Sequence, residues 1–535
     1  MGYYLNNKDA YTIFSGAAQS PYFVDKSMII DELIPRIGTT QRFVCITRPR
    51  RFGKSIMASM LGAFFTKEGN AGSLFENLKI SKSSQYEKHL NSHNVIYIDF
   101  SKYDDDCCTY DDYIANIKEV LQEDVRTAYP DVEFRKKASV AEDLTRVHQQ
   151  KKERFIFILD EWDAVFHMSF VLDRDKEKYL TFLKNLLKGN AYLEFVYMTG
   201  ILPIAKYSSG SELNDFLEYT MATKEMYSTY FGFTEEEVDE LYQRYLKMEK
   251  CPDVSREELR LWYDGYHTVS GKRMYNPRSV VCALSDNQIS NYWTSSGPYD
   301  EIFYYIEKNV AEVRDDLALM VSGIAVPAKV QEYAATSMNL STRDEIFSAM
   351  VVYGFLSYED GKVCIPNKEL ADKFSDMLKK EPSLGYIYRL AKESERMLRA
   401  TKAGDTTTMS EILEYTHDTE IPLLSYNNET ELTTVVNLVY LSARDFYVIQ
   451  REDKAGIGYV DFIFYPDKKD DDCIILELKV DHTAEEAIQQ IKDRKYDLRF
   501  KGKIGEEPRY TGRILAVGIA YDKGTKKHSC IVEVL

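Results

Sequence analysis

The chain has 535 residues, which is too long for a single hydrophobic core and indicates three or four domains. Its formal net charge of −17 argues against a protein that coats nucleic acid through its overall field, although a local basic groove stays open. The eight cysteines show no C-x-x-C and no paired spacing, so we expect reduced thiols in a cytoplasmic protein, not a zinc site or a disulfide framework.

A phosphate-binding loop is the first motif along the chain. The apolar run 43–46 is followed by Gly53-Lys54-Ser55, the end of G-x-x-x-x-G-K-[ST], and then by the helix-favouring run 56–65. In a strand, loop and helix of this order, the loop amides and the helix N-terminus bind the β-phosphate. Lys54 would contact the β- and γ-phosphates of ATP, and the Ser55 hydroxyl would bind Mg²⁺. Arg48 replaces the first glycine of the pattern.

A second ATPase motif follows downstream. The apolar run 155–159 ends in Asp160 and Glu161. An unbroken apolar run is typical of a strand buried on both faces of a parallel sheet, and an acid at its carboxyl end lies beside the nucleotide crevice. Asp160 is expected to hold Mg²⁺ through water, and Glu161 to polarise the attacking water. The alternative is a buried strand that ends in a solvated turn.

Two more apolar runs fit the same sheet, at residues 94–100 and 193–200. The second contains Thr199 near its end, which is either a γ-phosphate sensor or an ordinary strand terminus. With helical segments between them, the four runs predict a doubly wound α/β domain.

Several ordered motifs resemble the AAA-ATPase-like family of bacterial proteins, from about residue 12 to residue 300. They are Tyr22-Phe-Val-Asp25-Lys26-Ser, Arg48-Pro-Arg-Arg-Phe-Gly-Lys-Ser55, Leu159-Asp-Glu-Trp-Asp163, Phe231-Gly-Phe-Thr-Glu-Glu-Glu237, Trp262-Tyr-Asp-Gly-Tyr-His267 and Tyr275-Asn-Pro277. In that family Arg48 is the normal form of the loop, whereas Trp162 and Ser27 are minor departures. The resemblance implies ATP binding and hydrolysis, with nucleotide contacts from Arg50, Arg51, Phe52, Gly53, Lys54, Ser55, Ile56, Asp160 and Thr199.

The three arginines of the loop allow two interpretations. One of them could contact phosphate in cis or reach the nucleotide of a neighbouring protomer, which would make the protein a homo-oligomer. Alternatively, Arg50 and Arg51 pair with acids such as Asp25 or Asp163. The segment Asp25-Lys26 is a candidate cover for the nucleotide base.

The middle of the chain predicts three further parts. The ATPase domain, residues 1–233, is extended by an aromatic-rich segment over 234–300, in which His267 is expected to lie in a packed turn because no partner serine or cysteine is in view. Residues 301–375 end in a helix and a hairpin with an Asp360-Gly361 turn, the outline of a winged helix. A charged helical connector is expected over 376–420.

The carboxyl-terminal part carries a second candidate active site. The run 459–465 contains Asp461, and after a polar loop the run 473–480 contains Glu477 and Lys479. Residues two apart on a strand share a face, so Glu477 and Lys479 would project together with Asp461 opposite. In this D-x(n)-E-x-K constellation, Asp461 and Glu477 would bind Mg²⁺ and Lys479 would position or deprotonate the attacking water. Charges that merely alternate along strands are the alternative.

The flanks of this hairpin resemble the PD-(D/E)XK nuclease domain that is fused to such ATPases, over residues 421–535. A helix beginning near Glu429 or Glu431 resembles the first nuclease helix with its extra metal-site glutamate, and the helix phase favours Glu431. Gln490 and Tyr496 lie on a segment that resembles the helix beside the nuclease site.

Together the resemblances imply an ATPase and a Mg²⁺-dependent nuclease in one chain, with ATP and Mg²⁺ as cofactors and nucleic acid, DNA in the first place, as partner. The alternative is a regulatory ATPase whose nuclease-like domain binds nucleic acid or a protein without cleavage. The acidic net charge favours the alternative, whereas basic residues within 492–503 could line a groove. No apolar run reaches membrane-spanning length, so no membrane partner is expected.

Overall fold

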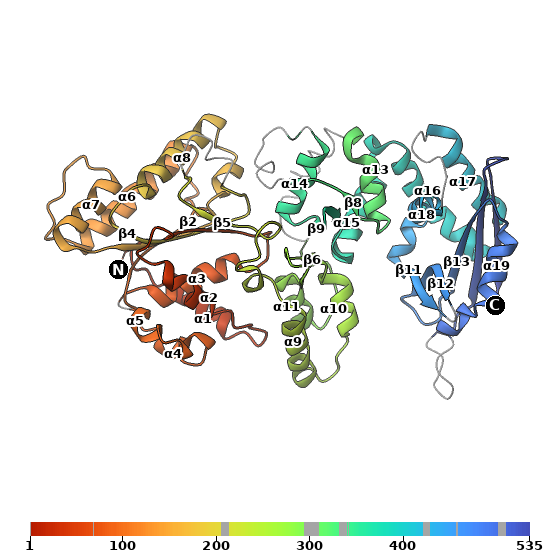
Figure 1. Ribbon diagram of the computed structural model, residues 1–535, viewed down its shortest axis with the longest axis horizontal. Helices are drawn as coiled ribbons and strands as arrows, with labels where there is room; N and C mark the ends of the chain where they lie inside the picture. Colours follow the sequence, from red (N-terminus) through yellow and green to blue (C-terminus); the bar gives the residue numbers. More distant parts are fainter. Residues whose placement is uncertain are drawn as a thin grey trace. The chain divides into compact units, whose positions relative to one another are not determined.

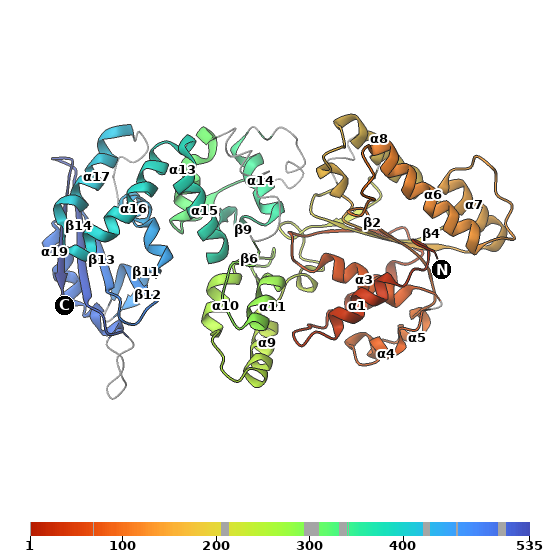
Figure 2. The same ribbon diagram turned by 180° about the vertical axis from the view of Figure 1, so that it is seen from behind.

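The computed structural model describes residues 2–67, 69–204, 213–293, 310–330, 340, 342–420, 429–455, 458–500 and 510–535. The chain divides into two compact units, of which the first holds Met1–Tyr305 and Pro327–Glu369. The second holds Ile306–Val326 and Leu370–Leu535 (Figures 1 and 2). Among the described residues, every helix is too short or too polar to cross a membrane.

A five-stranded parallel sheet organises the first unit. Its order is β2-β3-β4-β1-β5, so β1 lies between β4 and the short edge strand β5. The strands are β1 (Phe43–Thr47), β2 (Asn94–Asp99), β3 (Phe155–Asp160), β4 (Leu193–Gly200) and β5 (Leu217–Tyr219). The four predicted strands and the α/β class are thereby confirmed. β5 was not predicted, because three residues are too few to show a period.

Helices cover both faces of this sheet (Figure 1). One face carries α1 (Asp9–Ala18), α2 (Ile29–Leu33), α3 (Lys54–Phe65), α4 (Gly72–Phe75) and α5 (Tyr86–His89), and the other carries α6 (Tyr110–Ala128), α7 (Val140–Lys151) and α8 (Asp173–Leu187). The strands β1 and β3 are buried at every residue, since both of their sides face helices. All strands run parallel, so their carboxyl ends, with the predicted acids, meet at one edge.

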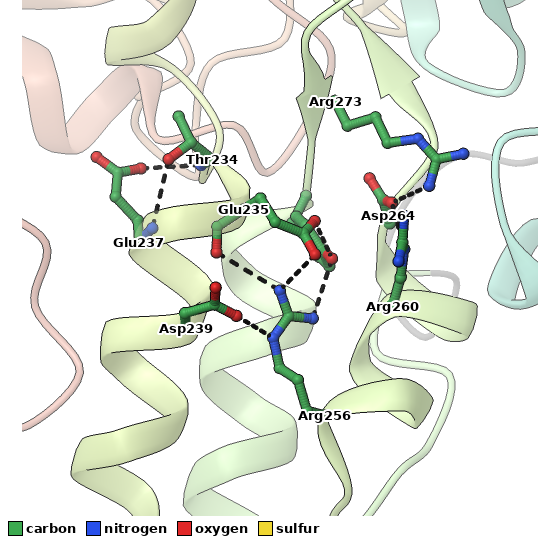
Figure 3. Close-up of polar contacts among 9 residues, drawn as sticks. Thr234, Glu235, Glu237, Asp239, Arg256, Arg260, Asp264 and Arg273 are labelled. Carbon is green, nitrogen blue, oxygen red and sulfur yellow. Dashed lines mark hydrogen bonds and ion pairs between the residues drawn. The ribbon is translucent and has the colours of Figure 1, made fainter.

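The described part of the first unit continues after the sheet with α9 (Glu235–Met248), α10 (Arg256–Tyr263) and α11 (Pro277–Asp286). The two-residue strands β6 (Tyr266–His267) and β7 (Arg273–Met274) lie between α10 and α11. Figure 3 shows how a single guanidinium joins these elements. Arg256 binds Asp239 at 2.7 Å, Glu235 at 3.0 Å and the Tyr275 hydroxyl at 3.0 Å. Because these partners come from α9 and from the segment before α11, Arg256 fixes the helices to one another.

The predicted helix and hairpin are present, and they lie in the first compact unit. They are α14 (Arg343–Tyr353), β9 (Ser357–Glu359) and β10 (Lys362–Cys364), with Asp360 and Gly361 in the left-handed region at the turn. The short strand β8 (Val326–Pro327) joins the same sheet beside β10. Assignment of this segment as a winged helix stays a prediction. The ring of His267 contacts the hairpin at the Ser357 hydroxyl, 3.1 Å, and the Glu359 carboxylate, 3.5 Å, which gives it a structural role.

The turn at Gly265 gives a test of this packing. Gly265 has a φ of +97°, and an added Cβ would lie 1.7 Å from the carbonyl oxygen of Pro366. Gly265→Ala is therefore expected to destabilise the protein by about 3 kcal/mol or more, because the left-handed backbone and the clash with a fixed carbonyl add together. Denaturant unfolding measures the loss. Gly189→Ala is the matched control, since Gly189 has a φ of +72° with no atom within 4 Å; equal losses in both variants would contradict the steric argument.

The second unit is built on another five-stranded sheet, of order β11-β12-β13-β14-β15. Only β13 and β14 run parallel, and the other neighbours are antiparallel. The strands are β11 (Tyr447–Ala455), β12 (Gly458–Pro466), β13 (Cys473–Val480), β14 (Ile514–Asp522) and β15 (Lys527–Val534). The helices are α13 (Val310–Val321), α15 (Lys368–Lys380), α16 (Tyr386–Ala403), α17 (Thr406–Glu420), α18 (Glu429–Val439) and α19 (Ala484–Asp493). α15 begins two residues before this unit does.

The segment predicted as a connector, residues 376–420, packs as part of this unit. Lys402 on α16 lies over the Tyr447 ring of β11, and its carbonyl accepts a hydrogen bond from Arg513 at 3.0 Å. Thr401 contacts the Tyr440 hydroxyl at 2.7 Å. The predicted boundary at residue 420 therefore falls inside a compact unit.

Candidate nucleotide and nuclease sites

The phosphate-binding loop joins β1 to α3 at the carboxyl edge of the first sheet. Gly53 caps α3 with a φ of +87°, and an added Cβ would meet no atom within 4 Å, so the backbone conformation alone favours glycine here. α3 begins at Lys54, which places the N-terminus of a 12-residue helix at the end of the loop. Free amides and the helix dipole at that position favour an anion such as a phosphate group.

Arg48, which replaces the first glycine, is a buried structural residue. Its side chain is 1% exposed, and its guanidinium donates to the carbonyl oxygens of Thr47 at 2.7 Å and Tyr219 at 2.8 Å. The guanidinium also lies over the Phe231 ring, 5.0 Å from its centroid. Arg48 thus anchors the start of the loop to β5 and to the segment before α9.

A cavity of about 1010 Å³ opens beside the loop. Its walls include every residue of the loop from Arg50 to Ile56, together with Glu161. Apolar side chains form another part of the wall: Phe14, Tyr22, Phe23, Met57, Met60 and Phe233. An apolar surface for a base next to a cationic loop for phosphates is the composition that a nucleoside triphosphate needs.

The segment proposed as a base cover also contributes. Lys26 lines the cavity, and its ammonium is held by Glu237 at 2.6 Å and by the Thr229 carbonyl at 2.6 Å. Asp25 accepts from the backbone of Ser27 and Lys79 at 2.9 and 2.6 Å. These two side chains therefore fix the segment in place.

Asp160, the last residue of β3, and Glu161, which follows it, differ in their surroundings. Burial raises the pKa of Asp160 to about 7, with further increases from Glu161 and Asp99, while Ser55 and Lys54 lie close enough to oppose the rise. Burial also raises the pKa of Glu161, and Lys54 and Arg50 oppose that rise. Glu161 has a φ of +50°, a conformation that a non-glycine residue adopts at a cost of about 1–3 kcal/mol and that is typical of functional sites.

These residues fit ATP and Mg²⁺. Asp160 is 1% exposed and lies beside Ser55, so a divalent cation at this point would compensate its buried charge. Lys54 is 5% exposed, and its Nζ contacts the Pro49 carbonyl at 3.1 Å, within the loop itself. Bound Mg²⁺ would neutralise phosphate charge there.

Two predicted nucleotide ligands, Asp160 and Thr199, are not among the residues that line the cavity. The Thr199 hydroxyl is fully buried near Tyr197, so its role as a sensor stays a prediction. Three charged residues that were not predicted do line the cavity, namely Asp99, Asp163 and Arg278. The first two carry a readable signal, since Asp99 ends a predicted strand and Asp163 closes Leu159-Asp-Glu-Trp-Asp163.

Asp163 also orders the end of β4. One oxygen of its carboxylate accepts from the amides of Ile201 at 3.0 Å and Leu202 at 2.7 Å. The indole of Trp162 donates to the Leu202 carbonyl at 3.1 Å. The acids after β3 and the chain after Thr199 are therefore held as one piece.

The second candidate site lies on the hairpin of β12 and β13, as predicted. Phe462 pairs with Leu476, so Asp461 and Glu477 stand opposite each other one residue further along. Asp461 accepts from the Leu478 amide at 2.7 Å, and Lys479 contacts Glu477 at 3.4 Å. Gln490 on α19 donates to the same Glu477 oxygen.

Glu477 is the central residue of this site. It is 3% exposed, and its buried Oε2 has no hydrogen-bond partner among the residues that the structure describes. Burial raises the pKa of Glu477 to about 7, Asp461 adds to the rise, and Lys479 opposes it. An orphaned carboxylate oxygen between an acid and a lysine fits a hard cation, which Mg²⁺ would supply.

Tyr496 and the helical glutamate complete the predicted set. Tyr496 is 1% exposed, and its hydroxyl is near Gln490 and Glu477. Glu429 and Glu431 lie on α18, but their side chains are outside the described residues, so the choice between them stays open. Within the part of the chain that is described, no group of three or more acidic, histidine or cysteine side chains is placed to hold a metal.

Comparisons with known proteins give a family for each of two parts of the chain. Residues 16–209 match the family described as predicted AAA-ATPase, and residues 427–529 match the PD-(D/E)XK nuclease superfamily. The chain contains a predicted AAA-ATPase domain and a PD-(D/E)XK nuclease superfamily domain. The remaining residues, including α14 and its hairpin, lie outside both matches.

The reported relatives and solved structures match only part of this chain and add little about activity. An uncharacterised protein of Azotobacter chroococcum, encoded in the vnfD 5′ region, is 27% identical over 281 residues, which are 52% of this chain and 51% of that protein. A solved structure of a Walker-type ATPase of Pyrococcus abyssi is 12% identical to this chain and has a TM-score of 0.39. The match covers 65% of this chain and 94% of the Pyrococcus chain. The structure of the ORC2 protein of Aeropyrum pernix is 11% identical, and the match covers 65% of this chain and 91% of the ORC2 chain with a TM-score of 0.33. These TM-scores are too low for a function to be inferred from the two structures.

Proposed function

We propose that the protein hydrolyses ATP in its first unit and cleaves nucleic acid phosphodiesters with Mg²⁺ in its second, and that the nucleotide state controls the cleavage. The observation that carries the proposal is the orphaned Oε2 of Glu477 beside Asp461 and Lys479. A bound Mg²⁺ would compensate the charge of this buried carboxylate, whose Oε2 accepts no hydrogen bond from the described residues. DNA is the expected substrate.

In the nucleotide site, Lys54 and Arg50 would bind the phosphates while Glu161 accepts a proton from the attacking water. Ser55 and Asp160 would hold Mg²⁺, which supplies charge neutralisation at the phosphates. Thr199 would sense the γ-phosphate. The carboxylates of Glu161 and Asp160 differ in depth of burial, so their charges respond differently to a bound cation.

In the nuclease site, Asp461 and Glu477 would hold Mg²⁺, with a helical glutamate, Glu431, as a further ligand. Mg²⁺ would polarise the phosphodiester and its bound water. Lys479 would position or deprotonate the attacking water, while Gln490 and Tyr496 keep the Glu477 carboxylate in one orientation. The segment of α14, β9 and β10, read as a winged helix, would carry the response to the nucleotide.

A second function is supported by a different observation. The net charge of −17 disfavours an enzyme that attracts nucleic acid through its overall field. In this alternative the second unit binds nucleic acid or a protein partner without cutting, and the ATPase acts as a regulator.

A cleavage assay on the purified full chain separates the two functions. Supercoiled plasmid, linear DNA and RNA would be incubated with Mg²⁺ and with ATP, ADP, a non-hydrolysable ATP analogue or no nucleotide. We expect Mg²⁺-dependent cleavage whose rate changes by about tenfold or more between nucleotide states, as a coupling of about 1–3 kcal/mol would give. Chelation by EDTA should stop it. ATP hydrolysis with no cleavage of any substrate would favour the alternative. Cleavage at the same rate in every nucleotide state would contradict the proposal that the nucleotide controls the nuclease.

A further inference from the structure

The outer face of the phosphate-binding loop is covered by later segments of the first unit. At Gly354 an added Cβ would lie 2.6 Å from the Cβ of Pro49. The Phe52 ring lies edge-on to Tyr266 with 5.0 Å between centroids, and the Phe52 carbonyl accepts from the Gly232 amide at 3.3 Å. The loop therefore depends for its shape on residues far along the chain.

Trp293 contacts the loop backbone directly. Its indole Nε1 donates to the Arg50 carbonyl oxygen at 3.3 Å, and its ring is 6% exposed and edge-on to Phe355. This carbonyl belongs to the peptide that precedes Arg51, whose φ of +71° is unfavourable for a residue with a Cβ. A hydrogen bond at this peptide holds a strained part of the loop in place.

Glu369 fixes Trp293 in turn. The Glu369 side chain is 1% exposed, and its Oε1 accepts from the amides of Tyr292 at 2.6 Å and Trp293 at 2.7 Å. The Ser279 hydroxyl of α11 donates to the same carboxylate, at 3.2 Å from Oε1 and 3.0 Å from Oε2. Burial raises the pKa of Glu369 to about 7, although the hydrogen bonds from these donors lower it. A buried carboxylate with this set of donors is a rigid joint between α11, the 291–293 segment and the start of α15.

We propose that Trp293, oriented by Glu369, is a positioning residue for the nucleotide site, because it holds the Arg50–Arg51 peptide in the conformation that binds phosphate. Arg50 lines the cavity and lies near Glu161. Displacement of the Arg50–Arg51 peptide would therefore move the Arg50 guanidinium away from the phosphates of a bound nucleotide. By linkage, a nucleotide that orders the loop also tightens the Trp293–Glu369–Ser279 contacts, and α11 and the start of α15 respond to its presence. This inference rests on the proposed ATP binding and hydrolysis.

Trp293→Phe tests the role of the indole N–H while keeping an aromatic ring against Phe355. We expect the Kd and the KM for ATP to rise about three- to tenfold, the value of one hydrogen bond, with kcat at saturating ATP changed by about twofold or less. Glu369→Gln should raise the same constants, because the neutral amide oxygen accepts the Tyr292 and Trp293 amides less strongly than the charged carboxylate oxygen does. Trp262→Phe on α10 is the matched control, since that ring contacts Tyr263 and Lys368 but not the loop.

Tryptophan fluorescence gives a readout that mere loss of stability would not move. ATP should change the emission of the wild type and of Trp262→Phe more than that of Trp293→Phe, in which Trp162, between the cavity residues Glu161 and Asp163, still responds. If the wild type binds no ATP, the proposed function fails. If it binds ATP and both Trp293→Phe and Glu369→Gln keep the wild-type Kd, the inference is wrong. If Trp293→Phe does not fold, the test uses Trp262→Phe, which keeps Trp293. The inference is then wrong if ATP leaves the emission of Trp262→Phe unchanged.

Discussion

Replacing Glu161 with glutamine is expected to lower kcat for ATP hydrolysis by about 10²–10⁴-fold, while ATP binding stays within about twofold. The expectation follows from the position of Glu161 on the cavity wall and from its surroundings. Lys54 and Arg50 lower its pKa against burial, so the side chain has cationic neighbours that hold it as an acceptor near the phosphates. An amide of the same shape keeps these contacts but cannot take a proton from water. Steady-state hydrolysis and equilibrium binding of a fluorescent ATP analogue measure the two effects.

Two further variants give this result its meaning. Lys54→Ala should weaken nucleotide binding itself, because it removes the ammonium at the start of α3 from the phosphates. Glu177→Gln, an exposed position on α8, should leave both constants unchanged. Hydrolysis at the wild-type rate in Glu161→Gln would show that another group activates the water, and Asp99 and Asp163 on the same wall would be the next candidates.

The sheet of the first unit could be predicted because its strands are short, unbroken apolar runs. At β1 and β3 every residue is buried, so composition alone distinguishes these strands from the amphipathic helices between them. The positions of the two acids followed from the same reasoning, since the carboxyl ends of parallel strands meet. The strand order 2-3-4-1-5 did not follow, because nothing local encodes which strands become neighbours.

Arg48 shows the limit of reading a motif. The sequence identifies it as the form that the resembling family uses, but its role comes from contacts with Tyr219 and Phe231, which lie far along the chain. The same holds for Trp293 and Glu369, where two ordinary residues meet the loop only after folding. Local patterns predict what a segment forms, whereas such long-range contacts depend on the whole topology.

The hairpin of the second unit was predictable for a different reason. Its period of two places Glu477 and Lys479 on one face, and the register of β12 and β13 adds Asp461. What could not be predicted is the depth of burial of Glu477, which arises because α19 covers this face and brings Gln490 onto the carboxylate. Burial is the property that turns a pair of acids into a candidate metal site.

Lys479→Ala is expected to reduce Mg²⁺-dependent cleavage of nucleic acid by about 10²–10⁴-fold, the range for loss of a group that assists proton transfer. Lys479 is the cation that stands 3.4 Å from Glu477, and its side chain is 18% exposed, so it faces both the carboxylate and the solvent from which water enters. Alanine leaves the two acids without that neighbour, and the pKa of Glu477 should rise further, because Lys479 opposes the rise. Initial cleavage rates at several Mg²⁺ concentrations measure the loss.

The design of this experiment separates catalysis from substrate binding. Lys468→Ala, an exposed lysine in the loop between β12 and β13, removes the same charge without touching the acids and should keep the wild-type rate. Glu477→Gln should lose activity that added Mg²⁺ cannot restore, because the amide no longer carries the charge that holds the cation. ATP hydrolysis should be unaffected in all three variants. Equal cleavage by Lys479→Ala and the wild type would refute the assignment of the hairpin as a nuclease centre and favour a domain that binds without cutting.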